Sequence, residues 1–258
     1  MNNTAVITGA SSGIGEAYAA AYAKQGYDLL LIARSKDKLE TLATALNKEH
    51  GINATSYPAD LTQSTDLLEL TQLLQNKPVS VLVNNAGVAT IGPFIKREPQ
   101  RLEEEVLLNI NAVVQLTRAV LPGMTLRNTG TVINIASSTA FQPSPFWTNY
   151  AATKSHVVSF TQALNDEVNG TGVFLQAVCP GPVDTGFENY ASDGNLDAPK
   201  FIFISPETVV RDSLKDIKKK REISIPAAHH RLVMNAGRLL PTRVSRLALR
   251  LSGKRMFD

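Results

Sequence analysis

Tyr150 and Lys154 are two residues whose chemistry and spacing suit proton transfer. If the segment around them is helical, residues four apart place their side chains on the same face, one turn from each other. A phenol beside an ammonium group is an acid prepared to release its proton, because the neighbouring positive charge favours the phenolate. Any amphipathic helix can supply such a pair, so its meaning depends on the elements around it.

The first of those elements are a strand, a glycine-rich turn and a helix at the start of the chain. Thr4–Thr8 is apolar and β-branched, which predicts a buried strand, and TGASSGIG follows at 8–15. Glycines there permit a tight turn, a close approach of the backbone to a pyrophosphate, and close packing of helix on strand. This predicts a dinucleotide site. The spacing of Gly9, Gly13 and Gly15 differs from G-x-G-x-x-G, so a glycine loop without a ligand is the alternative.

The residue after the second strand selects between the two nicotinamide dinucleotides. An acidic residue there bonds the 2′-hydroxyl of the adenosine ribose, whereas an arginine accommodates a 2′-phosphate. The strand predicted at Asp28–Ala33 is followed by Arg34 and Ser35, with no acid. This favours NADP(H) over NAD(H), and the alternative is an ordinary solvated loop charge.

The rest of the chain alternates between apolar strands and helical segments, which is typical of βαβ units. We therefore expect an α/β fold with a doubly wound, Rossmann-type parallel sheet in a single domain, residues 1–226, and ligands at the carboxyl ends of the strands. One long helix begins with Glu103, Glu104 and Glu105, an acidic turn that suits a helix N-terminus. Further strands are predicted at Asn53–Pro58, Val79–Asn84, Gly130–Ala136, Val173–Val178 and Glu222–Ile225, and helices from residue 13 to Gln25 and at Lys36–His50, Gln63–Gln75, Arg101–Arg127, Trp147–Asn169 and Pro206–Lys220.

Composition places the chain among globular proteins. It has 258 residues, of which 43% are hydrophobic and 19% charged. Cys179 is the only cysteine, so an intramolecular disulfide is excluded, and we interpret it as a packing residue. The N-terminus lacks the features of a signal peptide and no apolar run reaches the ~18 residues of a spanning helix, so the expected localisation is cytoplasmic. The four histidines are scattered and indicate no metal site.

Charge is distributed unevenly along the chain. Residues 211–258 contain 13 Lys+Arg and 4 Asp+Glu, a net of +9, whereas residues 1–210 contain 13 and 19, a net of −6. Residues 227–258 are predicted as a basic amphipathic helical C-terminal extension, with an apolar stripe over Ala228–Leu251 that Pro241 interrupts. Such a helix packs on its own body or on another subunit, or makes a peripheral membrane contact. No nucleic-acid recognition motif accompanies the charge, so nucleic acid is not an expected partner.

Several motifs at strand ends, taken together, resemble the short-chain dehydrogenase/reductase family. They are TGASSGIG at 8–15, NNAG at 84–87, Ser137 thirteen residues before Tyr150, YAATK at 150–154, and PGPVDT at 180–185. The match covers most of residues 4–226. Within the family, the chain looks most like NADP-dependent carbonyl reductases with a basic C-terminal extension.

The resemblance implies a catalytic tetrad of Asn109, Ser137, Tyr150 and Lys154. Tyr150 would be the general acid in carbonyl reduction and the base in alcohol oxidation. Lys154 would favour the phenolate and bond the nicotinamide ribose, and Ser137 would hold the substrate oxygen. Asn109 would prop open its helix and hold a water that links the lysine to solvent.

Two of these positions have close neighbours of the same type. Asn109 lies thirteen residues before Pro122, which distinguishes it from Asn111, and Ser138 is the less favoured neighbour of Ser137. The resemblance also implies that Thr185 bonds the nicotinamide carboxamide. The cofactor-binding residues that it implies are Gly9, Ser11, Ser12, Gly13, Ile14, Gly15, Arg34, Asp60, Leu61, Asn85, Ala86, Gly87, Tyr150, Lys154, Pro180, Gly181, Val183 and Thr185.

These expectations describe an NADPH-dependent oxidoreductase that interconverts a ketone or aldehyde and an alcohol. Gly186–Ser205 has little periodicity and is expected to cover the site as a lid. Phe141, Phe146 and Trp147 either line the same pocket, which favours a small hydrophobic carbonyl substrate, or simply pack against the lid. The resemblance further implies a homodimer or homotetramer. The alternative function is an NADP(H)-binding sensor or scaffold without turnover.

Overall fold

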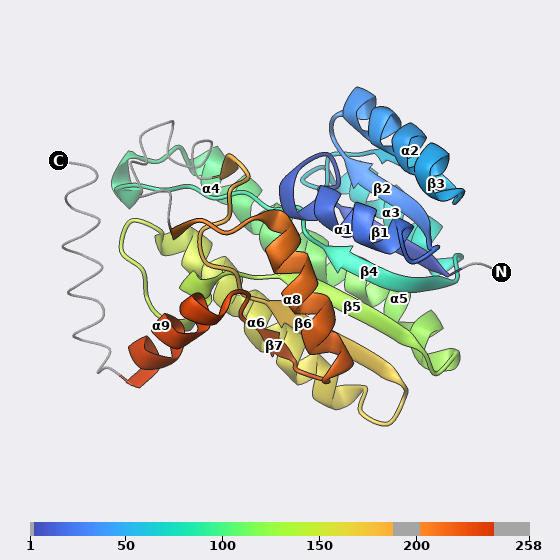
Figure 1. The fold of residues 1–258 in the computed structure, drawn as a ribbon. Helices are drawn as coiled ribbons and strands as arrows, with labels where there is room; N and C mark the ends of the chain where they lie inside the picture. Colours follow the sequence, from blue (N-terminus) through green and yellow to red (C-terminus); the bar gives the residue numbers. More distant parts are fainter. Residues whose placement is uncertain (1–2, 188–201, 240–258) are drawn as a thin grey trace.

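A seven-stranded parallel sheet forms the centre of the molecule in the computed structural model, which describes residues 3–187 and 202–239 (Figure 1). The strand order is β3-β2-β1-β4-β5-β6-β7, and every neighbouring pair is parallel. The predicted doubly wound, Rossmann-type sheet is thereby confirmed. The strands are β1 (Thr4–Thr8), β2 (Asp28–Ala33), β3 (Ala54–Pro58), β4 (Val79–Asn84), β5 (Gly130–Ile135), β6 (Val173–Val178) and β7 (Ile223–Ser224).

Helices cover both faces of the sheet, as right-handed crossovers require. Because strand side chains alternate between faces, Ala5 and Ile7 of β1 belong to one hydrophobic core and Val6 belongs to the other. The first core lies under α1 (Gly13–Ala23), α2 (Lys36–His50) and α8 (Pro206–Lys218), and the second under α3 (Ser64–Gln75), α5 (Val113–Leu126) and the end of α6 (Thr148–Glu167).

The segment predicted as one helix over Arg101–Arg127 contains a π-helical turn. α4 (Pro99–Val106) leads into η2 (Leu107–Ala112), after which α5 continues the helix. The wide turn contains Asn109, whose side chain reaches out to the backbone of Val88. π-turns of this kind occur frequently at functional sites, so the interruption marks this position as a candidate.

The early start of α4 corrects the interpretation of its three glutamates. Because the helix begins at Pro99, Glu103, Glu104 and Glu105 fall in its second half and do not form a first turn. Proline is well placed at the first helical position, since its missing N–H is not needed there. Glu105 is fully buried, whereas Glu103 faces solvent.

The continuous helical stretch Pro99–Leu126 is long and apolar enough to cross a membrane by length and composition. In the fold it flanks the sheet. Leu116, Val120 and Met124 are at most 3% exposed and pack in the second core. Packing against the sheet therefore accounts for the apolar character of the part that contains these residues.

The other element bounds match the prediction or differ from it by one or two residues, as fraying helix ends and short edge strands commonly do. β7 keeps only Ile223–Ser224 of its predicted four residues. Two short 3₁₀ turns, η1 (Phe94–Lys96) and η3 (Ser138–Phe141), were not predicted. η3 follows β5 directly and therefore shapes the site.

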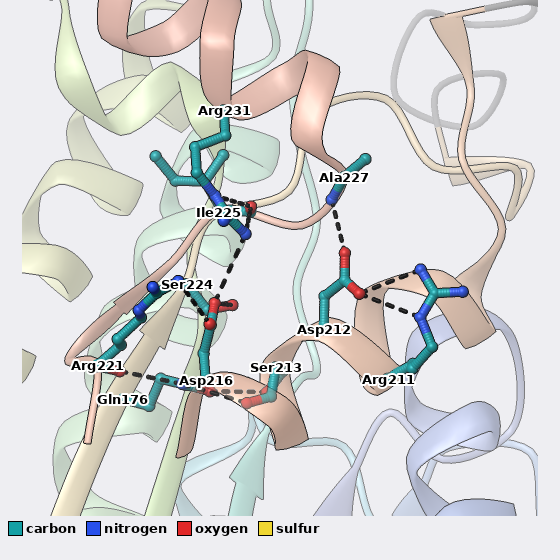
Figure 2. A network of polar contacts seen from close by, with 10 residues as sticks. All are labelled: Gln176, Arg211, Asp212, Ser213, Asp216, Arg221, Ser224, Ile225, Ala227 and Arg231. Atoms are coloured by element: carbon teal, nitrogen blue, oxygen red, sulfur yellow. Dashed lines mark hydrogen bonds and ion pairs between the residues drawn. The ribbon is translucent and has the colours of Figure 1, made fainter. Parts of the chain in front are cut away.

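A buried carboxylate connects the start of the predicted C-terminal extension to the α/β domain (Figure 2). Asp216 of α8 accepts hydrogen bonds from Arg221 at 3.0 Å and from Ser224 at 2.9 Å, and lies 3.8 Å from the guanidinium of Arg231. Arg231 belongs to α9 (Ala228–Leu239) and also donates to the carbonyl of Ile225. One acid thus joins α8, β7 and α9.

A second acid fixes the point where α9 begins. Asp212 of α8 accepts a hydrogen bond from the backbone N–H of Ala227 at 2.9 Å and pairs with Arg211 (Figure 2). Ala227 has a positive φ of 63°, so the chain turns sharply between β7 and α9. The rest of the predicted apolar stripe, including Pro241, lies outside the described residues.

Candidate active site

A cavity of about 850 Å³ lies at the carboxyl ends of the strands, where the sequence motifs were expected to converge. Of the catalytic and cofactor-binding residues predicted for the site, all but Gly15 and Asn109 line it. The lining includes Gly9, Ser11, Ser12, Gly13, Ile14, Arg34, Asp60, Leu61, Asn85, Ala86, Gly87, Ser137, Tyr150, Lys154, Pro180, Gly181, Val183 and Thr185. Segments from six strand ends therefore build one continuous site.

The glycine turn after β1 has the close packing that a phosphate cradle requires. A Cβ on Gly9 would lie 3.0 Å from Cα of Ala86, and one on Gly13 would lie 2.7 Å from Cγ2 of Thr185. Both glycines have positive φ, 63° and 57°, which other residues rarely adopt. Ser12 precedes α1 without capping it through its side chain, so first-turn N–H groups face the cradle. These residues fit the pyrophosphate of a dinucleotide.

Gly15 has a different role from the other two glycines. A Cβ at this position would lie 2.3 Å from the carbonyl oxygen of Gly9, which belongs to the backbone and cannot move aside. Gly15 therefore lets α1 pack directly against the turn. It does not line the cavity itself, so its packing role is the one that the structure shows.

Asn85 and Thr8 hold the ends of β4 and β1 together. The Asn85 side chain donates to the carbonyls of Thr8 at 2.9 Å and Gly9 at 3.2 Å. The Thr8 hydroxyl in turn accepts from the backbone N–H groups of Asn85 and Ala86, both at 2.9 Å. Sequence reasoning treated Thr8 only as a strand end, although it is the first residue of the glycine motif.

Arg34 and Asp60 lie at the end of the cavity formed by β2 and β3. Arg34 is exposed, and in the part of the chain that the structure describes it has no acidic partner. Asp60 shapes its own turn, accepting from the N–H of Thr62 at 3.0 Å and from its hydroxyl at 2.7 Å. The guanidinium is therefore available to an anionic ligand.

Tyr150 and Lys154 project from α6 into the cavity, as their spacing predicted. Lys154 is only 4% exposed, donates a hydrogen bond to the carbonyl of Ile135 at 2.8 Å, and lies 5.6 Å from the ring centre of Tyr150. Burial lowers the pKa of Lys154 to about 8, although Glu105 and Cys179 oppose this effect. A titratable cation thus lies directly beside the phenol.

Ser137 lies at the end of β5, where η3 begins. Its hydroxyl accepts hydrogen bonds from the N–H of Thr139 at 3.2 Å and the Thr139 hydroxyl at 3.0 Å, so its own proton is free to be donated into the cavity. The neighbouring Ser138 ties its backbone N–H to the carbonyl of Pro180 at 2.8 Å, which joins the ends of β5 and β6.

Asn109 sits behind the cavity wall. Its Oδ1 accepts from the N–H of Val88 at 3.0 Å, and its Nδ2 donates to the Val88 carbonyl at 2.8 Å and the Thr153 hydroxyl at 3.1 Å. A Cβ on Gly87 would lie 3.1 Å from Oδ1 of Asn109 and 3.4 Å from Nζ of Lys154, so the three groups adjoin. For Asn111, no side-chain hydrogen bond occurs among the described residues. This geometry favours Asn109 for the fourth position.

Aromatic rings form one wall of the cavity. The ring of Tyr150 lies 5.8 Å from that of Trp147 and 5.9 Å from that of Phe187, and Ile202 and Phe203 continue the wall. Residues 188–201 of the predicted lid lie outside the described residues.

Two of the three aromatic residues predicted for this wall do not contribute to it. Phe141 packs with Val157 and Cys179 because η3 turns it toward α6 and β6. Phe146, with a positive φ of 68°, places its carbonyl against the N–H of Gly92 and is absent from the described lining.

His230 is a neighbour of the site that sequence reasoning missed. A Cβ on Gly181 would lie 2.8 Å from Nδ1 of His230, and Nε2 of this histidine lies 3.0 Å from the carbonyl of Ile202. α9 therefore supports both the PGPVDT segment and the end of the lid. No local signal reveals this contact, because it depends on how α9 docks.

Fold and site together define a nicotinamide-dependent oxidoreductase of the Rossmann type. The family model described as short chain dehydrogenase matches residues 3–195, and the chain belongs to this family. It is accordingly an oxidoreductase that acts on alcohol and carbonyl groups.

Individual relatives cover nearly the whole chain. The very-long-chain 3-oxoacyl-CoA reductase of Bos taurus is 33% identical over 247 residues, which is 94% of this chain and 77% of the relative. A short-chain dehydrogenase from Sphingobium yanoikuyae, solved in complex with NADPH, superposes with a TM-score of 0.83 at 35% identity and 88% coverage of both chains. The bulky-bulky ketone specific alcohol dehydrogenase from Comamonas testosteroni gives 0.80 at 31% identity, covering 98% of this chain and 93% of that one.

Proposed function

We propose that this protein is an NADPH-preferring reductase of bulky, hydrophobic carbonyl compounds, with Tyr150 as the general acid. The observation that carries the proposal is the placement of Tyr150. Its ring belongs to the aromatic wall, its neighbour Lys154 is a buried cation, and both line the cavity that contains the glycine cradle.

The cofactor preference rests on Arg34, which lies exposed at the β2 end of the cavity with no acidic partner among the described residues. An arginine there suits the 2′-phosphate of NADP(H), because the guanidinium pairs with phosphate in a fork of two hydrogen bonds. The glycine turn and the first turn of α1 would hold the pyrophosphate. When bound, the nicotinamide supplies the hydride to the carbonyl carbon.

Ser137 and Tyr150 supply the hydrogen bonds that the reacting oxygen needs. Negative charge grows on that oxygen during reduction, so donors aimed at it stabilise the transition state more than the ground state. Tyr150 then gives up its proton to form the alcohol. A protonated Lys154 assists this transfer because it favours the phenolate that remains.

The substrate is proposed from the wall and from the relatives. Trp147 and Phe187 present apolar surface beside Tyr150, and Phe203 adds to the same lining, which suits a carbonyl group flanked by bulky apolar substituents. The similarity to an enzyme named as a very-long-chain 3-oxoacyl-CoA reductase and to one named as specific for bulky-bulky ketones supports this class. 3-Oxoacyl thioesters with long chains are therefore the first compounds to test.

A sensor or scaffold that binds NADP(H) without turnover is the competing function. Such a protein has no need of an ordered proton donor, whereas here Ser137, Tyr150, Lys154 and Asn109 are brought together. A screen of hydrophobic ketones, aldehydes and 3-oxoacyl thioesters with NADPH, followed by absorbance, discriminates the two. Turnover of at least one compound supports the enzyme, and binding without turnover across the panel supports the sensor.

Replacing Tyr150 with phenylalanine removes the proposed acid and keeps the ring in the aromatic wall. We expect kcat for carbonyl reduction to fall about 10²–10⁴-fold, the usual contribution of general acid catalysis. NADPH affinity, measured by fluorescence titration, should stay close to that of the wild type. A variant that keeps wild-type turnover would falsify the assignment.

A further inference from the structure

Glu105 is a carboxyl group that the proposed chemistry leaves unexplained. Its side chain is fully buried, and neither carboxylate oxygen has a hydrogen-bond partner among the described residues. A buried carboxylate is strongly unfavourable unless another charge compensates it. The position therefore needs a physical reason.

The surroundings of Glu105 lie against the catalytic residues. It precedes Asn109 by four residues, and Asn109 bonds Val88 and Thr153 and adjoins Gly87, which in turn lies beside the Lys154 ammonium. α6 is joined to α4 at this point, since Asn149 donates to the carbonyl of Leu102 at 3.2 Å. The carboxyl of Glu105 lies near Asn149 on α6, the helix that carries the lysine, and near Thr90, in the segment that follows the NNAG motif.

The electrostatics couple the two buried groups. Burial raises the pKa of Glu105, whereas the polar groups of Thr90 and Asn149 near the carboxylate and the positive charge of Lys154 lower it. Burial lowers the pKa of Lys154 to about 8, and Glu105 is the foremost group that opposes this.

Other ionisable groups around the pair are few among the described residues. Tyr150 lies on α6 one turn before the lysine, and Cys179, at the end of β6, also favours the charged lysine. On α4, Glu104 lines the cavity and Arg101 lies one turn before Glu105. Lys154 itself donates only to a neutral carbonyl, that of Ile135. Glu105 is therefore the carboxylate that can compensate the buried ammonium.

We propose that Glu105 is a positioning residue for catalysis, which keeps Lys154 in its charged form by serving as its buried counter-charge. The proposal rests on the proposed function for the role of Lys154 in favouring the Tyr150 phenolate. Without Glu105, the lysine loses its proton at a lower pH, and the phenol loses the neighbouring positive charge that makes it an effective acid.

The first test compares Glu105→Gln with Glu103→Gln. Both remove one negative charge from α4, but Glu103 is exposed and serves as the matched control. In the wild type, kcat for carbonyl reduction should fall as the pH rises through about 8, where Lys154 deprotonates. In Glu105→Gln this fall, the alkaline limb of the kcat–pH profile, should move to lower pH by about one unit or more. Glu103→Gln should leave it in place.

The second test needs no turnover. The folded-state pKa of Lys154, about 8, lies below its unfolded value of about 10.4, so between them the unfolded state binds more protons. The free energy of unfolding therefore gains a contribution that increases with pH over this window. In Glu105→Gln the increase should begin at a lower pH than in the wild type, as measured by urea unfolding of the apoprotein across pH. Glu103→Gln should match the wild type.

A third variant separates charge from packing. Glu105→Leu also removes the charge but replaces the polar head with apolar surface, and it should shift the alkaline limb and the unfolding onset in the same direction as Glu105→Gln. Wild-type profiles in both Glu105 variants, or equal shifts in Glu103→Gln, overturn the proposal. If Tyr150→Phe keeps turnover, the proposed function fails, whereas the unfolding profiles still decide the role of Glu105.

Discussion

Arg34 shows how one side chain at a strand end selects a cofactor. It lies at the β2 end of the cavity, exposed and without an acidic partner in the described part of the chain. An acid at this position would bond a ribose hydroxyl and repel a phosphate, so a cation favours the phosphorylated dinucleotide.

Arg34→Gln should lower kcat/KM for NADPH by about tenfold or more, the size expected from losing charge-assisted hydrogen bonds to a phosphate. The value for NADH should change little, because that cofactor has no 2′-phosphate. Lys48→Gln, at the exposed far end of α2, is the control for loss of one positive charge. Equal losses with both cofactors would show that Arg34 does not read the 2′-phosphate.

The pair of Tyr150 and Lys154 depends on neighbours that lie far away in the sequence. The phenol packs against Trp147 and Phe187, and the ammonium is held by the carbonyl of Ile135. Burial of the lysine is what brings its pKa down to about 8. A tyrosine and a lysine on an exposed helix could have the same spacing, but without burial the pKa of the lysine would not be lowered in this way.

At the level of elements, the corner formed by α8, β7 and α9 is held by a small number of polar contacts (Figure 2). Asp216 is 3% exposed and accepts from Arg221 and Ser224, with Arg231 close by. Because β7 has only two residues, its ladder with β6 contributes little, and these polar contacts stabilise the edge. The same corner places His230 against the active-site segment at Gly181.

Asp216→Ala should lower the free energy of unfolding by about 2–3 kcal/mol, because it leaves a buried hydroxyl and two partly exposed guanidinium groups without their partner. Urea unfolding measures this change, and limited proteolysis should show faster cleavage near the start of α9. Glu40→Ala removes an acid from an exposed pair on α2 and should change stability by about 0.5 kcal/mol or less. If both variants lose the same stability, the corner does not depend on Asp216.

The π-turn η2 is the second element that directs the site. A regular helix through residues 107–112 would keep its backbone N–H groups satisfied internally, but the wider turn places the side chain of Asn109 between Val88 and Thr153. The backbone around the NNAG motif is thereby tied to α6. The alignment of Lys154 with the cavity depends on this connection.

At the scale of the whole molecule, the active-site cavity lies at one edge of the sheet. The outer faces of the flanking helices are exposed and could bind another subunit. On α6, Ala152, His156 and Ser159 are exposed along one stripe, on the side opposite Tyr150 and Lys154. We propose that the protein forms a homodimer or homotetramer through this helix and its neighbour α5. In such an assembly, the neighbouring subunit would pack against the exposed face of α6 and restrict the movement of this helix.

Ala152→Arg tests this assembly. A charged side chain in the middle of a helix–helix interface loses its hydration without gaining a partner, so the complex should dissociate toward the monomer. Sedimentation velocity gives the mass of each species. Thr44→Arg, on the exposed face of α2, adds the same charge elsewhere and should leave the assembly unchanged. A wild-type protein that sediments as a monomer contradicts the proposal.

The sequence by itself determined the layered sheet and most of the residues that line the cavity. β2, α2, β4 and β6 begin and end at the predicted residues, because alternation of apolar runs and turn residues is a local signal. Motifs placed after strands converge because parallel strands share one carboxyl edge. The helical spacing of Tyr150 and Lys154 was also enough to put them on one face.

Only the tertiary structure decided features that depend on which distant segments touch. Gly15 turned out to pack against the Gly9 carbonyl, Phe141 to face away from the cavity, and His230 to support Gly181. Glu105 looked like an acidic helix start, yet it is buried beside the catalytic lysine. Burial and long-range contacts arise from the packing of whole elements, and no local pattern of residues encodes them.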